Sequence, residues 1–195
     1  MSAADWDGIT RALAAHSFAP AGGAARRAAV AMVLRDGEAG IELLLIRRAE
    51  HERDPWSGQV GFPGGRAEPE DESLEATAVR ETAEETGIDL RRDARLLGRL
   101  DELHARARGR PVDLVIAPFV FRLQRPAEGG PSSEVVSLHW LPLATLLDPA
   151  VRAPLEVQHE DATVRLPSLR AGGLVIWGLT YKMFLSFAEL LGLAP

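Results

Sequence analysis

The sequence predicts an α/β fold in which a mixed β-sheet lies between layers of helices, an α/β/α sandwich. Two observations carry this prediction. Short apolar runs come in adjacent pairs joined by turn residues, which is typical of β-hairpins. Segments with helical periodicity separate these pairs along the chain. The 195 residues are enough for one domain of ordinary size with a substantial core.

The first segment predicts a short helix followed by a linker. Residues 5–16 place three apolar side chains at helical spacing, namely Trp6, Ile9 and Leu13. Residues 19–23 are small and predict a weakly ordered linker. We therefore expect residues 1–23 to form a helix and linker that precede a domain of residues 24–195.

The next segment predicts a hairpin and a glycine turn. Apolar runs at residues 28–34 and 41–46 flank an Asp-Gly turn signal, so the two runs are expected to pair. A polar loop at residues 51–59 follows. A short strand at residues 60–62 then leads into a Pro-Gly-Gly turn.

Residues 73–86 predict an α-helix. Asp71, Glu72 and Ser73 stand where this helix would begin, and short polar or acidic residues favour that end. Gly87 stands where a glycine commonly ends a helix.

The second half of the chain continues the alternation of elements. The pattern predicts strands at residues 94–100, 112–123 and 134–140, a short helix at 143–147, a hairpin at 151–157 and 162–166, and a closing helix at 177–193. An arginine-rich turn at residues 104–111 is expected before the second of these strands. Pro118 is expected to interrupt that strand, because proline lacks an N–H donor.

Composition excludes several classes of protein. The net charge of −6, with Lys182 as the one lysine, argues against a general nucleic-acid binder, which needs a basic surface. The lack of cysteine excludes disulfides, thiolate metal sites and thiol nucleophiles. No apolar run approaches the roughly 20 residues of a membrane span, and the acidic N-terminus lacks a signal pattern. A cytoplasmic protein without a membrane or nucleic-acid partner is expected.

Three glutamates within the predicted helix indicate a metal site. Each helical residue advances roughly 100° around the axis, so Glu81, Glu84 and Glu85 share one face. Carboxylates packed this closely repel one another, and a divalent cation such as Mg²⁺ or Mn²⁺ would remove the repulsion. A solvated acidic face is the alternative interpretation.

The flanking residues favour the metal site. Arg80 precedes the first glutamate, where a bidentate contact would orient the carboxylates. A plain helix salt bridge is the alternative role for this arginine. Gly64 and Gly65 let the backbone pass close to a ligand, although they could also form a simple turn. A glycine turn that leads into a helix with three carboxylates indicates phosphate chemistry.

Residues 65–88 resemble the signature of the Nudix hydrolases, G-x5-E-x7-R-E-U-x-E-E-x-G-U. The match is complete at Arg80, Glu81, Glu84, Glu85 and Gly87. There are two departures: the spacing from the first glycine to the arginine is one residue longer, and Thr82 stands where an aliphatic residue is usual. Because of the longer spacing, either Asp71 or Glu72 takes the place of the early glutamate. Helix N-terminal charge is the alternative role for both.

The resemblance implies both a fold and a reaction. Nudix hydrolases have an α/β/α sandwich and hydrolyse a nucleoside diphosphate linked to another group. The resemblance implies that Glu84 and Glu85 are metal ligands, and that Glu81 is either a ligand or the base that takes the proton of water. Glu134 follows a flexible loop, where related enzymes often have one more acidic residue. A surface glutamate is the alternative.

Further segments resemble the coenzyme A diphosphatase subgroup of this family. Residues 44–49 followed by Arg53 resemble L-L-x-x-R-[SA]-x3-R, and residues 58–65 resemble G-x-V-A-F-P-G-G. Residues 77–81 resemble T-A-L-R-E, and residues 176–180 resemble I-W-G-x-T. The subgroup usually has a histidine after the second arginine, whereas this chain has Asp-Pro-Trp-Ser there.

Several residues are candidate contacts to the substrate. Those expected near phosphates are Arg47, Arg48, Arg53, Arg66, Gly64 and Gly65. Each arginine has a solvated surface position as its alternative. Trp56 is expected either to stack on an adenine ring or to cover the sheet edge.

The leading hypothesis is a metal-dependent diphosphatase that acts on coenzyme A or an acyl-coenzyme A. The same residues would suit ADP-ribose, a dinucleotide or a nucleotide sugar. The isomerase of isopentenyl diphosphate, which shares this fold, relies on a cysteine that the chain lacks. A non-catalytic nucleotide-sensing module would be expected to lose the metal carboxylates. The expected partner is a small-molecule substrate, and a homodimer is left open.

Overall fold

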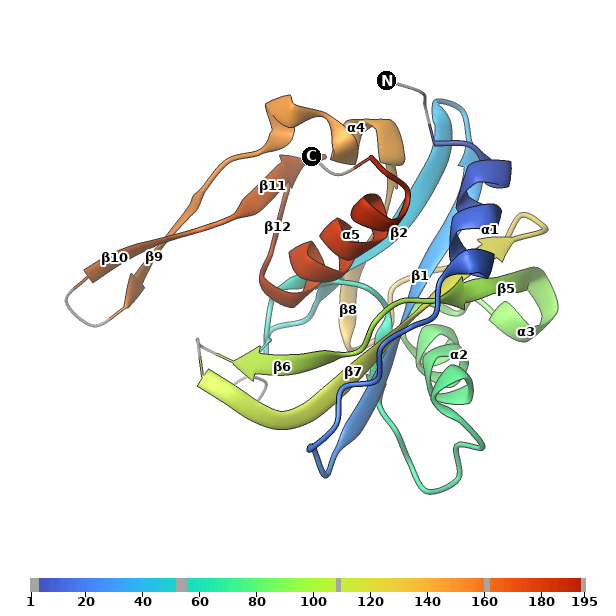
Figure 1. Ribbon diagram of the computed structural model, residues 1–195, viewed down its shortest axis with the longest axis horizontal. Helices are drawn as coiled ribbons and strands as arrows, with labels where there is room; N and C mark the ends of the chain where they lie inside the picture. Colours follow the sequence, from blue (N-terminus) through green and yellow to red (C-terminus); the bar gives the residue numbers. More distant parts are fainter. Residues whose placement is uncertain (1–3, 52–55, 108–109, 160–161, 194–195) are drawn as a thin grey trace.

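The computed structural model describes residues 4–51, 56–107, 110–159 and 162–193. A large mixed sheet lies at its centre with helices on both faces, which confirms the predicted α/β class (Figure 1). The strands of this sheet are β1 (Arg27–Gly37), β2 (Gly40–Arg48), β3 (Val60–Gly61), β4 (Gly64–Arg66), β5 (Ala94–Arg99), β6 (Leu103–Ala107), β7 (Arg110–Leu123) and β8 (Val135–Pro142).

Strand β1 organises the sheet. It pairs antiparallel with β2 near their shared turn and antiparallel with β4 near its own start. It also pairs parallel with β7 along most of its length. Successive side chains of a strand point to opposite faces of the sheet. Val30 and Met32 therefore enter one apolar core, and Ala31 and Val33 enter the other.

The helices divide between these two cores. They are α1 (Trp6–Ala15), α2 (Leu74–Thr86), α3 (Leu90–Asp93), α4 (Leu143–Leu147) and α5 (Gly178–Leu190). Buried residues of α2 and α3 belong to the core with Ala31, whereas those of α1, α4 and α5 belong to the core with Met32. The sandwich is thus formed by helices on opposite faces. No helix in the described ranges is long and apolar enough to cross a membrane.

Helix α1 packs onto the sheet rather than standing apart from it. Its side chains Ile9 and Leu13 are almost fully buried in the core that α5 also covers. Its start is fixed to the β1–β2 turn, because Nε1 of Trp6 donates a hydrogen bond to Asp36 at 2.6 Å. The guanidinium of Arg122 stacks on the same indole ring. The division at residue 23 stays a prediction.

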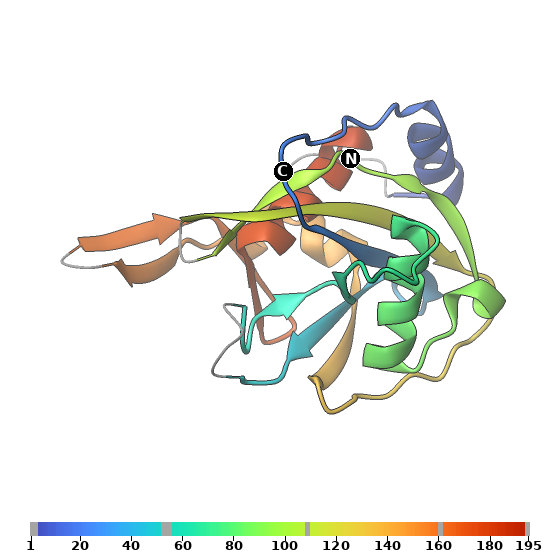
Figure 2. The same cartoon turned by 90° about the horizontal axis from the view of Figure 1, so that it is seen from below.

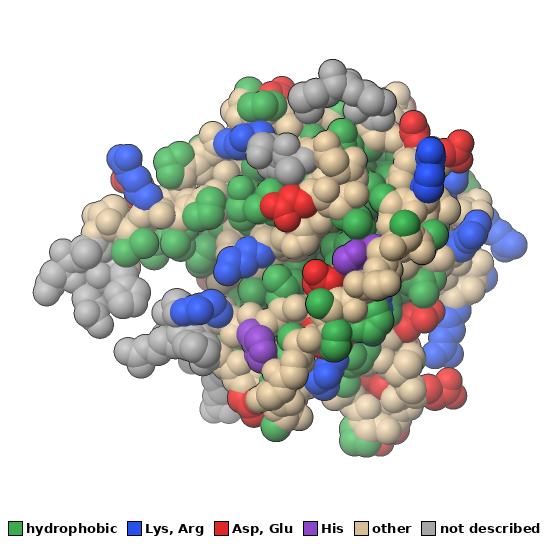
Figure 3. Space-filling view, viewed as in Figure 1, with side chains coloured by type: hydrophobic (Ala, Val, Ile, Leu, Met, Phe, Trp, Pro, Cys, Tyr) green, Lys and Arg blue, Asp and Glu red, His purple; other side chains and the backbone are tan. Residues whose placement is uncertain are grey.

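Two further hairpins follow α4. Strands β11 (Ser168–Ala171) and β12 (Leu174–Trp177) pack against the core that contains α5. Strands β9 (Leu155–His159) and β10 (Ala162–Leu166) project from the body of the molecule (Figure 2). The projecting hairpin carries apolar side chains on one face, namely Leu155, Val157, Val164 and Leu166. Apolar side chains are visible there on the surface (Figure 3).

The second half differs from the predicted elements in several places. The expected arginine-rich turn is a hairpin of β6 and β7, in which Ala105 is buried between the exposed residues His104 and Arg106. Strand β7 runs unbroken through Pro118, whose carbonyl oxygen accepts a hydrogen bond from the N–H of Leu100 at 3.0 Å. A 3₁₀ helix precedes β9, and β12 ends where the closing helix was expected to begin.

Candidate active site

Helix α2 begins and ends as the sequence predicts. The side-chain oxygen of Ser73 accepts a hydrogen bond from the N–H of Ala76 at 3.1 Å, which caps the first turn. Gly87 ends the helix with a φ angle of 73°, a left-handed conformation that favours glycine. Ala78 and Val79 pack into the core beneath the helix. This packing fixes the rotation of α2, and therefore the direction of its glutamates.

Thr82 occupies its apolar environment without leaving a polar group unpaired. Its side chain is fully buried, and its hydroxyl donates to the carbonyl oxygen of Ala78 at 2.6 Å. Thr86 repeats the arrangement one turn later by donating to the carbonyl oxygen of Thr82 at 2.6 Å. A buried hydroxyl that is hydrogen-bonded carries little penalty. The departure from an aliphatic residue is therefore accommodated within the helix itself.

The glycine turn brings backbone against the helix carboxylates. Gly64 has a φ angle of 152°, and a Cβ atom there would overlap the carbonyl oxygen of Ala29. A Cβ atom on Gly65 would overlap the carboxylate of Glu81. Only glycine therefore fits at position 64, whereas a side chain at position 65 would displace the carboxylate of Glu81. The N–H of Gly64 donates to Oε2 of Glu85 at 2.8 Å, so the turn also supplies a hydrogen bond to the site.

Glu85 is the buried carboxylate of the site, with 3% of its side chain exposed. Its Oε1 atom accepts a hydrogen bond from Nη1 of Arg48 at 3.0 Å. Burial raises the pKa of Glu85 to about 7, against the opposing effects of the Gly64 N–H and Arg48. The nearby carboxylates of Glu81 and Glu134 raise this pKa further.

Glu81 is half-buried, whereas Glu84 lies at the surface with 58% of its side chain exposed. Burial raises the pKa of Glu81, and Arg80 opposes this shift. The carboxylates of Glu84 and Glu134 raise it further. Nη1 of Arg80 donates both to Glu81 at 3.0 Å and to Glu84 at 3.1 Å. The arginine therefore joins these two carboxylates.

Arg80 is itself held by Asp71 and by the glycine turn. Its Nε and Nη2 atoms donate to the two oxygens of Asp71 at 3.0 and 2.9 Å, and Nη2 also donates to the carbonyl oxygen of Arg66 at 3.0 Å. Hydrogen bonding by Arg80 holds the pKa of Asp71 well below its usual range. Glu72 is exposed. Of the two candidates for the early acidic position, Asp71 is thus the residue that contacts the site.

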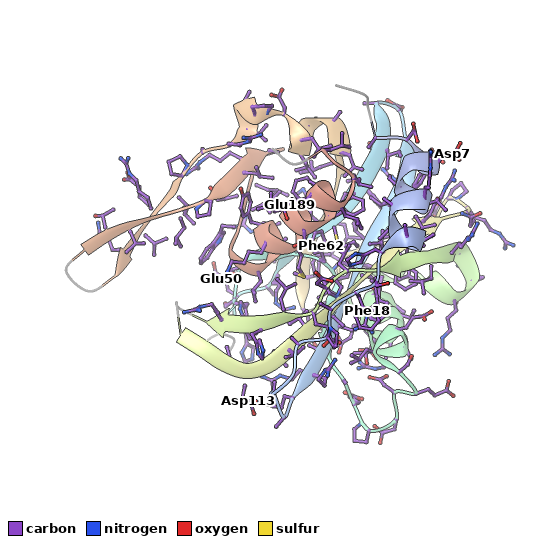
Figure 4. All side chains as sticks on the ribbon, viewed as in Figure 1. Asp7, Phe18, Glu50, Phe62, Asp113 and Glu189 are labelled. Atoms are coloured by element: carbon purple, nitrogen blue, oxygen red, sulfur yellow. The ribbon has the colours of Figure 1, made fainter. Side chains whose placement is uncertain are left out.

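A cavity of about 650 Å³ lies between the glycine turn, α2 and α5. Its polar lining, called the polar wall below, includes Arg48, Gly64, Gly65, Arg66, Glu81, Glu85 and Glu134. Its apolar lining, called the apolar wall below, includes Val30, Phe62, Ile116, Leu179 and Met183. In Figure 4, Phe62 lies near the middle of the molecule, beside α5. Glu50, which also lines the cavity, lies further toward the periphery. The cavity therefore offers both charged and apolar groups to one ligand.

The start of α5 is tied to the cavity wall through Thr180. Its hydroxyl donates to the carbonyl oxygen of Val60 at 3.0 Å, and the side chain is 7% exposed. This hydrogen bond joins α5 to β3 across the edge of the cavity. The threonine of the I-W-G-x-T segment therefore positions the apolar wall.

The structure brings together some of the predicted site residues but not others. Glu81, Glu85, Arg48, Arg66 and the two glycines line the cavity, whereas Glu84 and Arg47 do not. Trp56 also lines it. Arg53 lies outside the described residues.

Sequence patterns alone gave less weight to two groups of residues that belong to this cavity. Glu134 lines it, although the sequence favoured a surface role for this residue, and its side chain is indeed exposed. It reaches the cavity because its carbonyl oxygen accepts the N–H of Ala49 at 2.8 Å, which joins the end of β2 to the start of β8. Leu179 and Met183 were not predicted, and their helical spacing on α5 is the signal that could have found them.

The polar wall has donors that suit a divalent cation. Glu81, Glu85 and Glu134 line it together, and carboxylate oxygens are the ligands that hard cations prefer. In the part of the chain that the structure describes, no three histidine, aspartate or glutamate side chains converge to metal-ligand spacing. Arg48 and Arg80 instead form salt bridges with Glu85 and Glu81. The donor set fits a divalent cation, with arginines in contact with the carboxylates that would bind it.

Comparison with known proteins identifies the family. The Nudix domain matches residues 25–164 of the chain. The uncharacterised Nudix hydrolase NudL of Yersinia pestis is 35% identical over 150 residues, which cover 75% of this chain and 71% of that protein. An uncharacterised protein of Schizosaccharomyces pombe is 40% identical over 123 residues, or 62% of this chain. The aligned region spans 37% of the length of that relative.

Solved structures of Nudix proteins share the fold. An Ap4A hydrolase from C. elegans aligns over 63% of this chain and 83% of its own, with a TM-score of 0.51 and 23% identity. A MutT/Nudix family protein from Enterococcus faecalis aligns over 97% of this chain and 70% of its own, with a TM-score of 0.54 and 17% identity. At such identities the likeness shows the fold alone. From the domain match and the Yersinia relative, the chain belongs to the Nudix hydrolases, a family of pyrophosphohydrolases.

Proposed function

We propose that this protein hydrolyses the diphosphate bond of coenzyme A or an acyl-coenzyme A, with Mg²⁺ or Mn²⁺ as cofactor. The observation that carries the proposal is the cavity with two unlike walls. Its carboxylates and arginines suit a diphosphate, and its apolar wall suits a long arm of low polarity. The segments that resemble the coenzyme A diphosphatase subgroup support the same substrate.

Nudix hydrolases generally use divalent metal ions. When bound, such an ion neutralises the charge of the diphosphate, activates water and stabilises the leaving oxygen. Glu81, Glu84 and Glu85 are the proposed ligands. The presence of Glu134 on the same wall as Glu81 and Glu85 supports adding it to this set.

The remaining roles fall to residues around the same wall. Glu81 is proposed to serve either as a metal ligand or as the base that accepts the proton of the attacking water. Arg80 orients Glu81 and Glu84 through its hydrogen bonds to both. Arg48 and Arg66 are proposed to bind phosphate oxygens, together with Arg53 and the glycine turn.

A substrate panel tests the proposal. Coenzyme A, an acyl-coenzyme A, ADP-ribose, NADH and a nucleotide sugar are each incubated with Mg²⁺ or Mn²⁺, and the products are followed by phosphorus NMR and mass spectrometry. We expect metal-dependent conversion of coenzyme A to phosphopantetheine and adenosine 3′,5′-bisphosphate. Faster turnover of ADP-ribose, a dinucleotide or a nucleotide sugar would support the alternative substrates instead. Nucleotide binding without turnover of any diphosphate would indicate a sensing module.

Matched variants test the assignment of the carboxylates. Glu84→Gln and Glu85→Gln should abolish turnover, while circular dichroism shows an unchanged fold. Arg47→Gln serves as the control, because Arg47 is exposed and does not line the cavity. Full activity in both glutamine variants would refute the metal-site assignment.

A further inference from the structure

Arg48 and Glu85 form a salt bridge inside the proposed site. The two side chains differ in exposure: 28% of Arg48 is accessible, compared with 3% of Glu85. Nη1 of Arg48 donates to Oε1 of Glu85 at 3.0 Å, and the N–H of Gly64 donates to Oε2 at 2.8 Å. Both oxygens of this buried carboxylate therefore already have partners within the protein.

The surroundings of Glu85 explain why a positive partner is needed. Glu81 and Glu134 lie on the same cavity wall and act on Glu85 as like charges. A buried carboxylate among like charges is unfavourable unless a positive group pairs with it. Arg48 supplies that positive charge from the last residue of β2.

The two partners differ in how freely they can move. Glu85 projects from a packed helix and is also fixed by a backbone hydrogen bond. Arg48 has a long side chain that is partly in solvent and lines the same cavity. A guanidinium group binds both carboxylates and phosphates, so Arg48 has the chemistry to pair with either anion in this cavity.

We propose that Arg48 is an exchangeable counter-ion. It pairs with Glu85 until a divalent cation binds that carboxylate, and it then turns to a phosphate oxygen of the diphosphate. The proposal rests on the proposed function, because it assumes a metal-dependent diphosphatase. It assigns Arg48 two opposite effects: competition with the cation, and attraction of the substrate.

The test measures these two effects separately in the protein of residues 1–195. Binding of Mn²⁺ alone is measured by calorimetry and by the electron paramagnetic resonance of free Mn²⁺. Binding of methylenediphosphonate, a diphosphate analogue that is not hydrolysed, is then measured at saturating Mn²⁺. The variants are Arg48→Met and the control Arg47→Met, since Arg47 is the exposed neighbour that does not line the cavity.

In Arg48→Met we expect Mn²⁺ to bind about tenfold more tightly and methylenediphosphonate about tenfold more weakly. The control should match the wild type in both. A purely structural role for Arg48 would weaken both ligands, and that result would overturn the proposal, as would an unchanged Mn²⁺ affinity. If Arg48→Met folds only when Mn²⁺ is present, the cation has replaced the arginine, which supports the proposal.

The outcomes also separate this proposal from the proposed function. If the wild type binds no Mn²⁺ and hydrolyses no diphosphate, the proposed function fails. If the wild type does both but Arg48→Met does not bind Mn²⁺ more tightly, only the counter-ion role fails. Should Arg48→Met not fold under any condition, Arg48→Lys carries the same test. A lysine lacks the planar fork of arginine, so its weaker hold on Glu85 should still give a few-fold gain in Mn²⁺ affinity.

Discussion

The carboxylate of Asp71 binds the guanidinium of Arg80 on the side opposite Glu81 and Glu84. Both Asp71 oxygens accept hydrogen bonds, at 3.0 Å from Nε and 2.9 Å from Nη2. This leaves Nη1 to contact Glu81 and Glu84. A planar guanidinium fixed at two nitrogens has little freedom at the third. Asp71 therefore orients Arg80, and through it Glu81 and Glu84, without lining the cavity itself.

Replacing Asp71 by asparagine should affect both stability and turnover. The side chain is 7% exposed, so loss of its charge leaves Arg80 inadequately paired, and we expect about 2 kcal/mol less stability. The kcat value should fall while KM changes little, because Asp71 does not line the cavity. Urea unfolding and steady-state kinetics measure the two effects. Glu72→Gln, at the exposed neighbour, should change neither; equal effects at the two positions would argue against the assignment.

The stabilisation by Asp71 should depend on pH. Its folded-state pKa lies well below the ordinary value of 3.8, so the contribution is present above about pH 4 and is lost as the pH falls through the acidic range. The difference in unfolding free energy between wild type and Asp71→Asn should therefore be constant from pH 5 to pH 7 and shrink below about pH 4. Urea titrations at several pH values give this difference. A gap that widens in acid would contradict the assignment.

Alanine substitutions at the two glycines of the turn should have different effects, one on stability and the other on turnover. Gly64→Ala places a Cβ against the backbone of Ala29 and Val30 at a positive φ angle, so we expect a loss of about 3 kcal/mol or more. Gly65→Ala places its Cβ against the end of the Glu81 side chain, which can move aside. That variant should keep its stability but lose most of its turnover. Thermal unfolding beside kinetics distinguishes them, and wild-type turnover in Gly65→Ala would show that the position of Glu81 is unimportant.

Glu102 should anchor the segment between α1 and β1. Its side chain is 2% exposed and forms salt bridges with Arg27 and Arg99, and its Oε2 atom accepts the N–H of Ala21 at 2.9 Å. Glu102→Gln leaves two arginines without their charge partner, so we expect a loss of about 3 kcal/mol. Limited proteolysis should then cut within residues 16–26. The exposed Glu128→Gln is the control, and equal protease resistance in both variants would count against this role.

The elements that the sequence predicts well are those with local signals. The β1–β2 hairpin follows from two apolar runs and an Asp-Gly turn, and α2 follows from a serine cap and a glycine stop. Strand β6 was missed because arginine and histidine side chains hide its period-two pattern, in which Ala105 faces the core. The prediction that Pro118 interrupts its strand was wrong, because a strand tolerates one missing N–H donor where the neighbouring hydrogen bonds persist.

The site depends on contacts that no local pattern contains. The spacing of Glu81, Glu84 and Glu85 predicts a shared face, but only the rotation of α2 against the sheet decides that Glu84 faces solvent. The choice between Asp71 and Glu72 depends on which one Arg80 can reach. Glu134 enters the cavity through a pairing between β2 and β8, whose residues lie far apart in the sequence.

The parallel pairing of β1 with β7 has a consequence for folding during synthesis. Val30 of β1 and Ile116 of β7 line the same cavity, and Met183 of α5 completes its apolar wall. These residues are separated by most of the chain, and contacts of such long range form slowly. A chain emerging from the ribosome therefore cannot assemble this cavity until α5 has been synthesised. Until then the face of β1 that carries Val30 and Met32 lacks part of its cover, and in this interval it is exposed to aggregation.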